Sequence, residues 1–457
     1  MTEKYDAIVI GCGMGGMVAA LMLAHDGKRV AILEKHSFTG GRLSSYKKQG
    51  FTVDLGCHTI SRGAKGPAVW PLERCGIEDA IQFDVVRPQS RWHGEIFRFP
   101  RDLKGKIPDK DYEAAMQFFS DVKAFPKKMI PFMDQFTTEE MLSQYTTNDA
   151  VGSGVSRACG MYGGTPQWQL AAGEFIRDMQ AEAECHSSGY PKGGCQGITN
   201  AYIDALNMFH AEIKLNTPVD KILIRDGRAY GVLTSDGVEY DADVIISNVD
   251  IQQTMLGLVG RDELPSEYVK KIENLEWGNT STVVKVALDA QLTDIKMLTQ
   301  FTDINTHEYY RRMAEGDVPE ELNLFFVCAS NFSPECAPEG YQLWAISTAM
   351  PQGCPSDTSE KIKEKVELTL DGWFPGWREH VIFEDLLDSA TLERTMGEHG
   401  VGIGLALTPD QVSEKRPSQK TPIANLYQCG AEAGGHGSGI ELASESALEL
   451  YDNYLSR

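Results

Sequence analysis

A glycine-rich turn near the N-terminus has the composition and spacing of a phosphate-binding loop. Gly11, Gly13 and Gly16 lie in the run Gly-Cys-Gly-Met-Gly-Gly, directly after the apolar stretch 7–10. Glycines at this spacing permit a tight turn, a close backbone approach to a pyrophosphate, and close packing of the next helix. The N-terminus of that helix offers free N–H groups and a partial positive charge. The turn therefore predicts a site for the pyrophosphate of a dinucleotide.

An acidic residue follows at the position that ribose binding requires. Residues 28–33 read as a second strand, and Glu34 stands at its end, about 20 residues after the glycines. A carboxylate there can accept hydrogen bonds from ribose hydroxyls. Lys35 is included among the expected cofactor contacts. An ordinary glycine-rich turn needs no acid at this position, so the combination favours dinucleotide binding.

A second glycine pair, Gly40 and Gly41, is followed by Arg42. The glycines again let the backbone approach a ligand, and the guanidinium can donate two parallel hydrogen bonds to phosphate oxygens. The run 50–56 then indicates a turn, a strand and another turn.

These residues need a parallel sheet with covering helices to hold them in place. Residues 7–10 and 28–33 are short β-branched runs, typical of buried parallel strands, and 17–23 between them reads as a helix. Further along, 190–194 precedes a predicted helix over 196–209, and 213–248 reads as strands joined by turns.

Near the C-terminus, a strand over 425–429 leads into Gly430 and Glu432. The glycine-rich turn 434–439 follows, and 440–451 reads as a helix.

Together, these three segments resemble the FAD domain of the flavin amine oxidase and phytoene desaturase superfamily. The resemblance rests on Glu34 with Gly40-Gly41-Arg42, on Asp54-Leu55-Gly56, on Pro191-Lys192-Gly193-Gly194, and on the C-terminal glycine turn. It implies FAD as the cofactor. The positions assigned to FAD binding are Gly11, Gly13, Gly16, Glu34, Lys35, Gly41, Arg42, Val219, Gly430, Glu432, Gly439 and Ile440.

The resemblance also implies how some of these positions act. The residue matching Val219 contacts the adenine side through its backbone in this family, and Glu432 matches the acid near the ribityl and pyrophosphate groups. The helix after the C-terminal glycine turn points its N-terminus at the flavin pyrimidine ring. A helix dipole at that place stabilises the negative charge of reduced flavin. No Cys-x-x-Cys occurs in the chain, so no metal site is expected.

The expected fold is α/β. A three-layer Rossmann-type FAD-binding domain would comprise 1–80, 189–251 and 393–457, with an inserted α+β substrate domain comprising 81–188 and 252–392. A chain of 457 residues accommodates both, since about 150 residues typically form one domain.

Two histidines are candidate catalytic residues. His58 stands in an Asp-x-Gly-x-His run that is similar to retinol saturase and carotenoid isomerase relatives, and His436 lies inside the C-terminal glycine turn. A histidine beside the flavin could donate a proton or a hydrogen bond. A packed or surface histidine is the alternative for each. Arg62 and Tyr162 are weaker candidates.

The resemblance favours an FAD-dependent oxidoreductase. Such an enzyme would move a hydride between flavin and a C–C or C=C bond of an apolar, isoprenoid- or carotenoid-like substrate, as a desaturase, saturase or isomerase. A flavin amine oxidase or porphyrinogen-type oxidase is the first alternative, although no aromatic amine-recognition pair is evident near Gly430. The second alternative is a prenyl-binding carrier resembling Rab GDP dissociation inhibitors, which have lost FAD. The sequence does not decide whether the electron partner is oxygen, a quinone or a redox protein.

Charge and hydropathy limit the other partners. The chain has 43 basic and 65 acidic residues, a net charge of −22, which repels nucleic acid and anionic lipid. Without a secretory signal or a span of about 18 apolar residues, a cytoplasmic location is expected. The segment 124–133 mixes apolar and basic residues and could form a peripheral membrane contact, or simply a loop over the core. The oligomeric state is not indicated.

Overall fold

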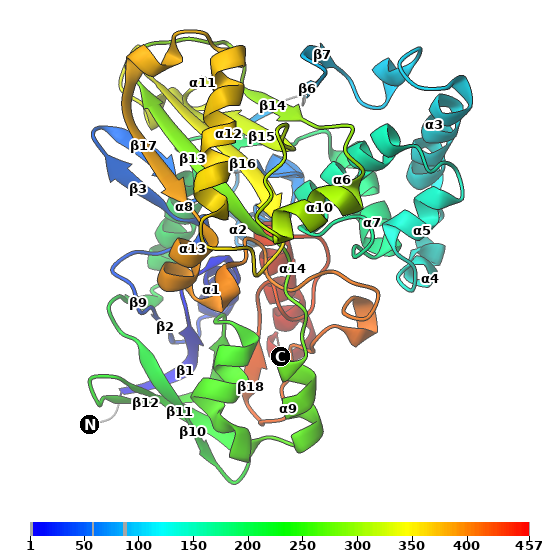
Figure 1. Cartoon of the computed structure of the whole chain (residues 1–457). Helices are drawn as coiled ribbons and strands as arrows, with labels where there is room; N and C mark the ends of the chain where they lie inside the picture. The colour runs from blue at the N-terminus through cyan, green and yellow to red at the C-terminus, as the bar shows by residue number, and fades with distance from the viewer. Residues whose placement is uncertain (1–2, 57–58, 86–88, 457) are drawn as a thin grey trace.

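Two seven-stranded sheets organise the part of the chain that the computed structural model describes, residues 3–56, 59–85 and 89–456 (Figure 1). The first sheet lies in the lower half of Figure 1 and the second in the upper half.

The first sheet has a parallel core in the order β9-β2-β1-β12-β18, and the antiparallel hairpin β10–β11 continues along the start of β12. Its strands are β1 (Glu3–Ile10), β2 (Val30–Leu33), β9 (Glu212–Lys214), β10 (Val219–Arg225), β11 (Arg228–Thr234), β12 (Glu239–Ser247) and β18 (Leu426–Gln428).

Helices cover both faces of this sheet because its strands are apolar on both sides. Along β1, Ala7 and Val9 face α1, α8 and α14, whereas Ile8 and Ile10 belong to the cluster on the opposite face. This alternation is what the pleat of a strand imposes. The first group is α1 (Met14–His25), α8 (Cys195–Met208) and α14 (Gly439–Leu450), and the second is the π-helical turn η5 (Gln253–Gly260) with α9 (Ser266–Glu273).

The second sheet has the order β17-β13-β16-β15-β14-β6-β7 and is antiparallel except where β14 pairs with β6. Its strands are β6 (Gln89–Trp92), β7 (Glu95–Phe97), β13 (Thr280–Leu288), β14 (Met297–Gln300), β15 (Leu324–Cys328), β16 (Gln342–Met350) and β17 (Val381–Leu387).

The two faces of the second sheet differ in character. One face packs Val284, Trp344 and Ile346 against α12 (Thr358–Trp373) and α10 (Thr306–Ala314). On the other face, part of the surface is covered by the hairpin of β3 (Ser45–Lys48) and β4 (Phe51–Asp54), through apolar contacts of Phe51 and Val53. The rest of that face carries mainly small polar side chains together with Phe325, and it lines a cavity.

A group of helices flanks the second sheet, at the upper right of Figure 1. Its core contains Phe118, Val155 and Phe175. The helices are α3 (Asp109–Ala124), α4 (Ile130–Met133), α5 (Thr138–Ser143), α6 (Asp149–Gly163) and α7 (Ala172–Cys185). The remaining elements are α2 (Trp70–Arg74), β5 (Phe83–Val85), β8 (Gly189–Pro191), α11 (Ala329–Phe332) and α13 (Ser389–Met396).

The segment 124–133 lies at the surface of this helical group. Met129 and Phe132 are exposed, Ile130 is buried, and Lys127 pairs with Glu184. Membrane contact there stays a prediction. Among the described residues, helices that combine the length and the apolar character needed to cross a bilayer do not occur.

The expected α/β class with a Rossmann-type first domain and an inserted second one is confirmed. The first sheet draws its strands from 3–33, 212–247 and 426–428, and the second from 89–97 and 280–387. The domain boundaries themselves stay a prediction. The first helix starts at Met14, three residues before the expected start at Met17, because the last glycines of the turn already lie in its first turn.

Two leucines of α12 test which face of this helix packs on the sheet. Leu370 is 1% exposed and Leu368 is 61% exposed. We expect Leu370→Ala to lower the free energy of unfolding by about 2–5 kcal/mol, because it leaves a cavity. The matched Leu368→Ala should change it by no more than about 0.5 kcal/mol. Urea unfolding of both variants measures this, and equal losses would contradict the assigned packing.

Candidate functional site

The glycine turn between β1 and α1 is packed so closely that side chains cannot enter it. A Cβ atom on Gly16 would lie 2.2 Å from the carbonyl oxygen of Gly11, and one on Gly13 would lie 2.7 Å from Oδ1 of Asn248. α1 begins at Met14 and has no side-chain cap at Gly13. Side chains therefore do not cap the N–H groups of its first turn, which leaves them available to a phosphate.

Asn248 joins this turn to the C-terminal motif. It follows β12, and its Nδ2 donates to the carbonyl oxygen of Cys429 at 3.2 Å. A Cβ on Gly430 would lie 2.5 Å from the same nitrogen. Sequence reasoning missed this residue. Its position at the carboxyl end of a strand beside β1 was the available signal, since ligands of parallel sheets gather at that edge.

Glu34 is buried at the end of β2 and organises the backbone around it. Its Oε2 accepts from the N–H of Cys12 at 2.8 Å, and its Oε1 accepts from the N–H of His36 at 2.9 Å. The N–H of Thr217 donates to the carbonyl oxygen of Glu34 at 2.8 Å. This contact brings the start of β10, at Val219, to the same end of the site. Lys35 is exposed.

The second glycine pair lies directly against the first turn. The N–H of Gly40 donates to the carbonyl oxygen of Cys12 at 2.9 Å. Nη2 of Arg42 lies 3.5 Å from Oε1 of Glu432, which is almost fully buried. The fold therefore brings together two expected cofactor residues that are far apart in the sequence.

The C-terminal glycine turn is held by Arg416, which sequence reasoning also missed. Its buried guanidinium donates from Nε to the carbonyl oxygen of Gly434 at 2.7 Å, and from Nη2 to that of Ala431. α14 then begins at Gly439 without a side-chain cap, and Ile440 lies in its first turn.

These residues fit FAD. A glycine turn that excludes Cβ atoms and an uncapped helix start suit the pyrophosphate, and the buried Glu34 suits a ribose. Arg42 and Glu432 would lie beside the phosphates and the ribityl chain, and the start of α14 would face the flavin ring.

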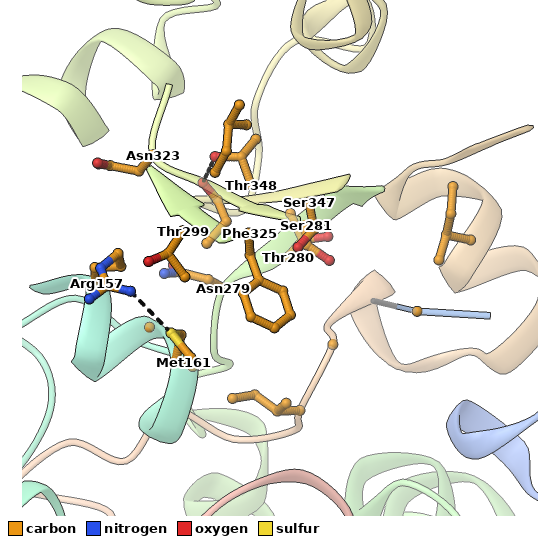
Figure 2. Close-up of a pocket in the computed structure, with 18 of the residues that line it drawn as sticks. Arg157, Met161, Asn279, Thr280, Ser281, Thr299, Asn323, Phe325, Ser347 and Thr348 are labelled. Atoms are coloured by element: carbon orange, nitrogen blue, oxygen red, sulfur yellow. Dashed lines mark hydrogen bonds between the residues drawn. The ribbon is translucent and has the colours of Figure 1, made fainter. Parts of the chain in front are cut away.

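A cavity of about 270 Å³ lies between this region and the second sheet. Figure 2 shows Arg157 and Met161 on α6 at one side, with Phe325 and Ser347 on the sheet. Arg42, Gly56 and Ile403 line it on the cofactor side. Ile403 connects the two regions, because a Cβ on Gly439 would lie 3.8 Å from its Cγ2. Ile403 therefore lies between the start of α14 and the cavity.

A cluster of buried ionisable groups lies between α7 and α14. Burial raises the pKa of Asp178 well above its ordinary value, and burial together with the charge of Glu441 raises the pKa of Glu182 to about 7. Arg62 lies between Glu441 and Glu445, 3.4 and 3.5 Å from their carboxylate oxygens. The cluster can therefore hold protons at neutral pH, close to the start of α14.

Of the two candidate catalytic histidines, His58 lies outside the described residues. His436 has its Nδ1 3.0 Å from Oε1 of Glu174, and it is not among the described residues that line the cavity. The hydrogen bond to Glu174 raises the pKa of His436. Burial raises the pKa of Glu174, but its contacts with His436 and Arg177 outweigh this and keep the pKa below its ordinary value. A catalytic role for either histidine stays a prediction.

This chain is similar in sequence to a family of flavin-containing oxidoreductases and to individual known enzymes. The family model described as flavin containing amine oxidoreductase matches residues 14–449. A phytoene desaturase (lycopene-forming) from Pseudescherichia vulneris is 23% identical over 475 residues, which cover 95% of this chain and 95% of that protein. Prolycopene isomerase 1, chloroplastic, from an Oncidium hybrid cultivar is 26% identical over 469 residues, which cover 87% of this chain and 75% of that protein.

The fold also has solved counterparts. The crystal structure of an oxidoreductase from Methanosarcina mazei superposes with a TM-score of 0.74 at 21% identity, and the match covers 98% of this chain and 100% of that one. At this identity the likeness establishes the fold alone.

Gly16 tests the phosphate loop. We expect Gly16→Ala to weaken FAD binding by about tenfold or more, because its Cβ would collide with the carbonyl oxygen of Gly11. The control is Gly372→Ala, whose Cβ meets nothing within 4 Å. Flavin absorbance after desalting, together with the melting temperature, measures the effect. Full flavin retention by Gly16→Ala would refute this assignment.

The pair of His436 and Glu174 predicts a pH-dependent contribution to stability. Because the pKa of His436 is raised above 6.5, its stabilisation is complete below that pH and is lost as the pH rises through the raised value. The difference in unfolding free energy between the wild type and His436→Gln should therefore shrink from about pH 6 to about pH 9. Urea unfolding across this range measures it, and a constant difference would contradict the pairing.

Proposed function

The chain belongs to the family of flavin-containing amine oxidoreductases, in its phytoene desaturase-like branch, and we propose that it moves a hydride between FAD and a C–C or C=C bond of an apolar unsaturated substrate. It is an FAD-dependent oxidoreductase. The proposal concerns the bond that reacts and the isoprenoid- or carotenoid-like nature of the substrate. Desaturation, saturation and isomerisation all fall within it.

The observation that carries the proposal is that Ile403, which lies beside the start of α14, also lines the cavity. A flavin ring held at that helix would border the cavity. The names of the relatives support the substrate class, since they describe enzymes of phytoene desaturation and prolycopene isomerisation.

When bound, FAD supplies the hydride chemistry. The start of α14 has no side-chain cap, so its N–H groups and partial positive charge would stabilise negative charge on the bound ring. The second sheet and α6 enclose the substrate and exclude water. Glu182, whose pKa burial raises to about 7, can hold a proton near this region.

The cavity does not favour an amine substrate. The charged side chains among the described residues that line it are Arg42 and Arg157. A protonated amine would meet charges of its own sign there, without a carboxylate in the lining to receive it. The carrier alternative is disfavoured because the residues that fit FAD are all present.

We also propose an electron partner and a peripheral membrane contact for this protein. Oxygen, a quinone or a redox protein would exchange electrons with the flavin. Exposed Met129 and Phe132, beside Lys127 and Lys128, offer a surface for peripheral membrane contact.

The visible spectrum of the purified protein tests this function. We expect a flavin spectrum, with absorbance changes on anaerobic addition of unsaturated isoprenoids, from farnesoic acid to phytoene, to the oxidised or to the reduced protein. Slow reoxidation in air would agree with a dedicated electron partner.

Two other results would contradict the proposal. Fast reoxidation with peroxide release, combined with turnover of amines but not of polyenes, would favour an amine oxidase. Absence of flavin, with no uptake of added FAD, would favour the carrier.

A further inference from the structure

Arg157 is a cation on the cavity wall that has no acidic partner among the described residues. It extends from α6, opposite the polar face of the second sheet (Figure 2). Its Nη1 lies 3.6 Å from Sδ of Met161, a weak acceptor, and its guanidinium lies 5.8 Å from the centre of the Phe301 ring. Its Nε is buried and has no hydrogen-bond partner within the described ranges.

Two other largely buried arginines have their charge compensated by carboxylates, whereas the buried Arg416 donates to backbone carbonyl oxygens. Arg177 lies 2.7 Å from Asp134, and Arg62 lies between two glutamates. Burial lowers the pKa of Arg157 to about 10, so its guanidinium keeps its charge at neutral pH. A buried charge without a counter-ion is costly. The free donors of Arg157 are therefore available to a ligand.

Other polar side chains line the cavity that Arg157 borders. Ser156, Asn279, Tyr310, Ser281 and Ser347 also line the cavity, and Nδ2 of Asn279 donates to the hydroxyl of Tyr310 at 3.2 Å. A hydrocarbon substrate would gain nothing from these groups. The volume of about 270 Å³ is also just below the usual range of ligand cavities, which are about 300–1,000 Å³.

We propose that Arg157 binds a carboxylate of the substrate, so that the substrate is an unsaturated carboxylic acid whose apolar chain extends toward Ile403 and the flavin side. This inference rests on the proposed function. The guanidinium matches a carboxylate in two parallel hydrogen bonds. One unpaired cation suits a single negative charge, whereas a diphosphate would need more cations than the lining offers, since Arg42 already pairs with Glu432.

Three probes with one carbon skeleton test the inference: farnesoic acid, farnesol and farnesyl phosphate. Binding to the flavin-loaded protein is measured by calorimetry and by the change in flavin absorbance. We expect the wild type to bind the acid about 10- to 100-fold more tightly than the alcohol, as a charge-assisted hydrogen-bonded pair predicts.

Substitutions then assign the preference to the guanidinium. Arg157→Met should lose the preference for the acid, so that it binds the acid and the alcohol with similar affinity. Arg157→Lys should keep part of it, because a lysine retains the charge but not the two-pronged geometry. Arg225→Met, on the distant hairpin β10–β11, is the control and should behave as the wild type. Flavin content and melting temperature verify that each variant is folded.

Several binding results would overturn the inference. Equal binding of acid and alcohol by the wild type, or an unchanged preference in Arg157→Met, would overturn the inference. Tighter binding of farnesyl phosphate than of the acid would overturn the choice of a carboxylate, and so would binding of none of the three probes. Failure of the proposed function looks different: the acid would bind in an Arg157-dependent way, but neither acids nor hydrocarbons would change the redox state of the flavin.

Discussion

The structure depends on the close contact of three backbone segments at the carboxyl edge of one parallel sheet. Gly13 and Gly16 of the first turn, Gly430 of the last motif and the side chain of Asn248 leave no space for an added Cβ atom. Contacts this close require glycine and fix the segments relative to one another. Helices α1 and α14 consequently begin at one edge, and their uncapped first turns are available to a single extended cofactor.

Charge is distributed differently on the two sides of this edge. On the cofactor side, Arg42 pairs with Glu432. Arg62 pairs there with both Glu441 and Glu445. These pairs hold segments in place that are distant in the sequence, since removing one partner would leave the other charge buried and uncompensated. On the substrate side, Arg157 has no such partner among the described residues. The paired arginines stabilise the fold, whereas Arg157 keeps hydrogen-bond donors that a ligand can use.

The second sheet defines the substrate side through the alternation of its strands. Along β16, Trp344 and Ile346 are large and apolar and face α12, whereas Ser347, the residue after Ile346, faces the cavity. The hairpin β3–β4 covers part of this same face and belongs to the segment that begins with Gly40 and Gly41. The cofactor site and the cavity are therefore held together by one continuous stretch of chain.

The sequence by itself determined the α/β class and predicted a dinucleotide site at the glycine turns, because phosphate binding needs a local pattern of strand, glycines and helix that a short window contains. FAD in particular followed from the resemblance of three segments to the flavin amine oxidase and phytoene desaturase superfamily. Asn248, Arg416 and Arg157 were not predictable in this way. Their roles depend on partners that are remote in the chain, Gly430 for the first and the opposing sheet for the last. Only the tertiary structure decided which of the many charged residues are paired and which face a cavity, since compensation of a buried charge depends on distance in space rather than in sequence.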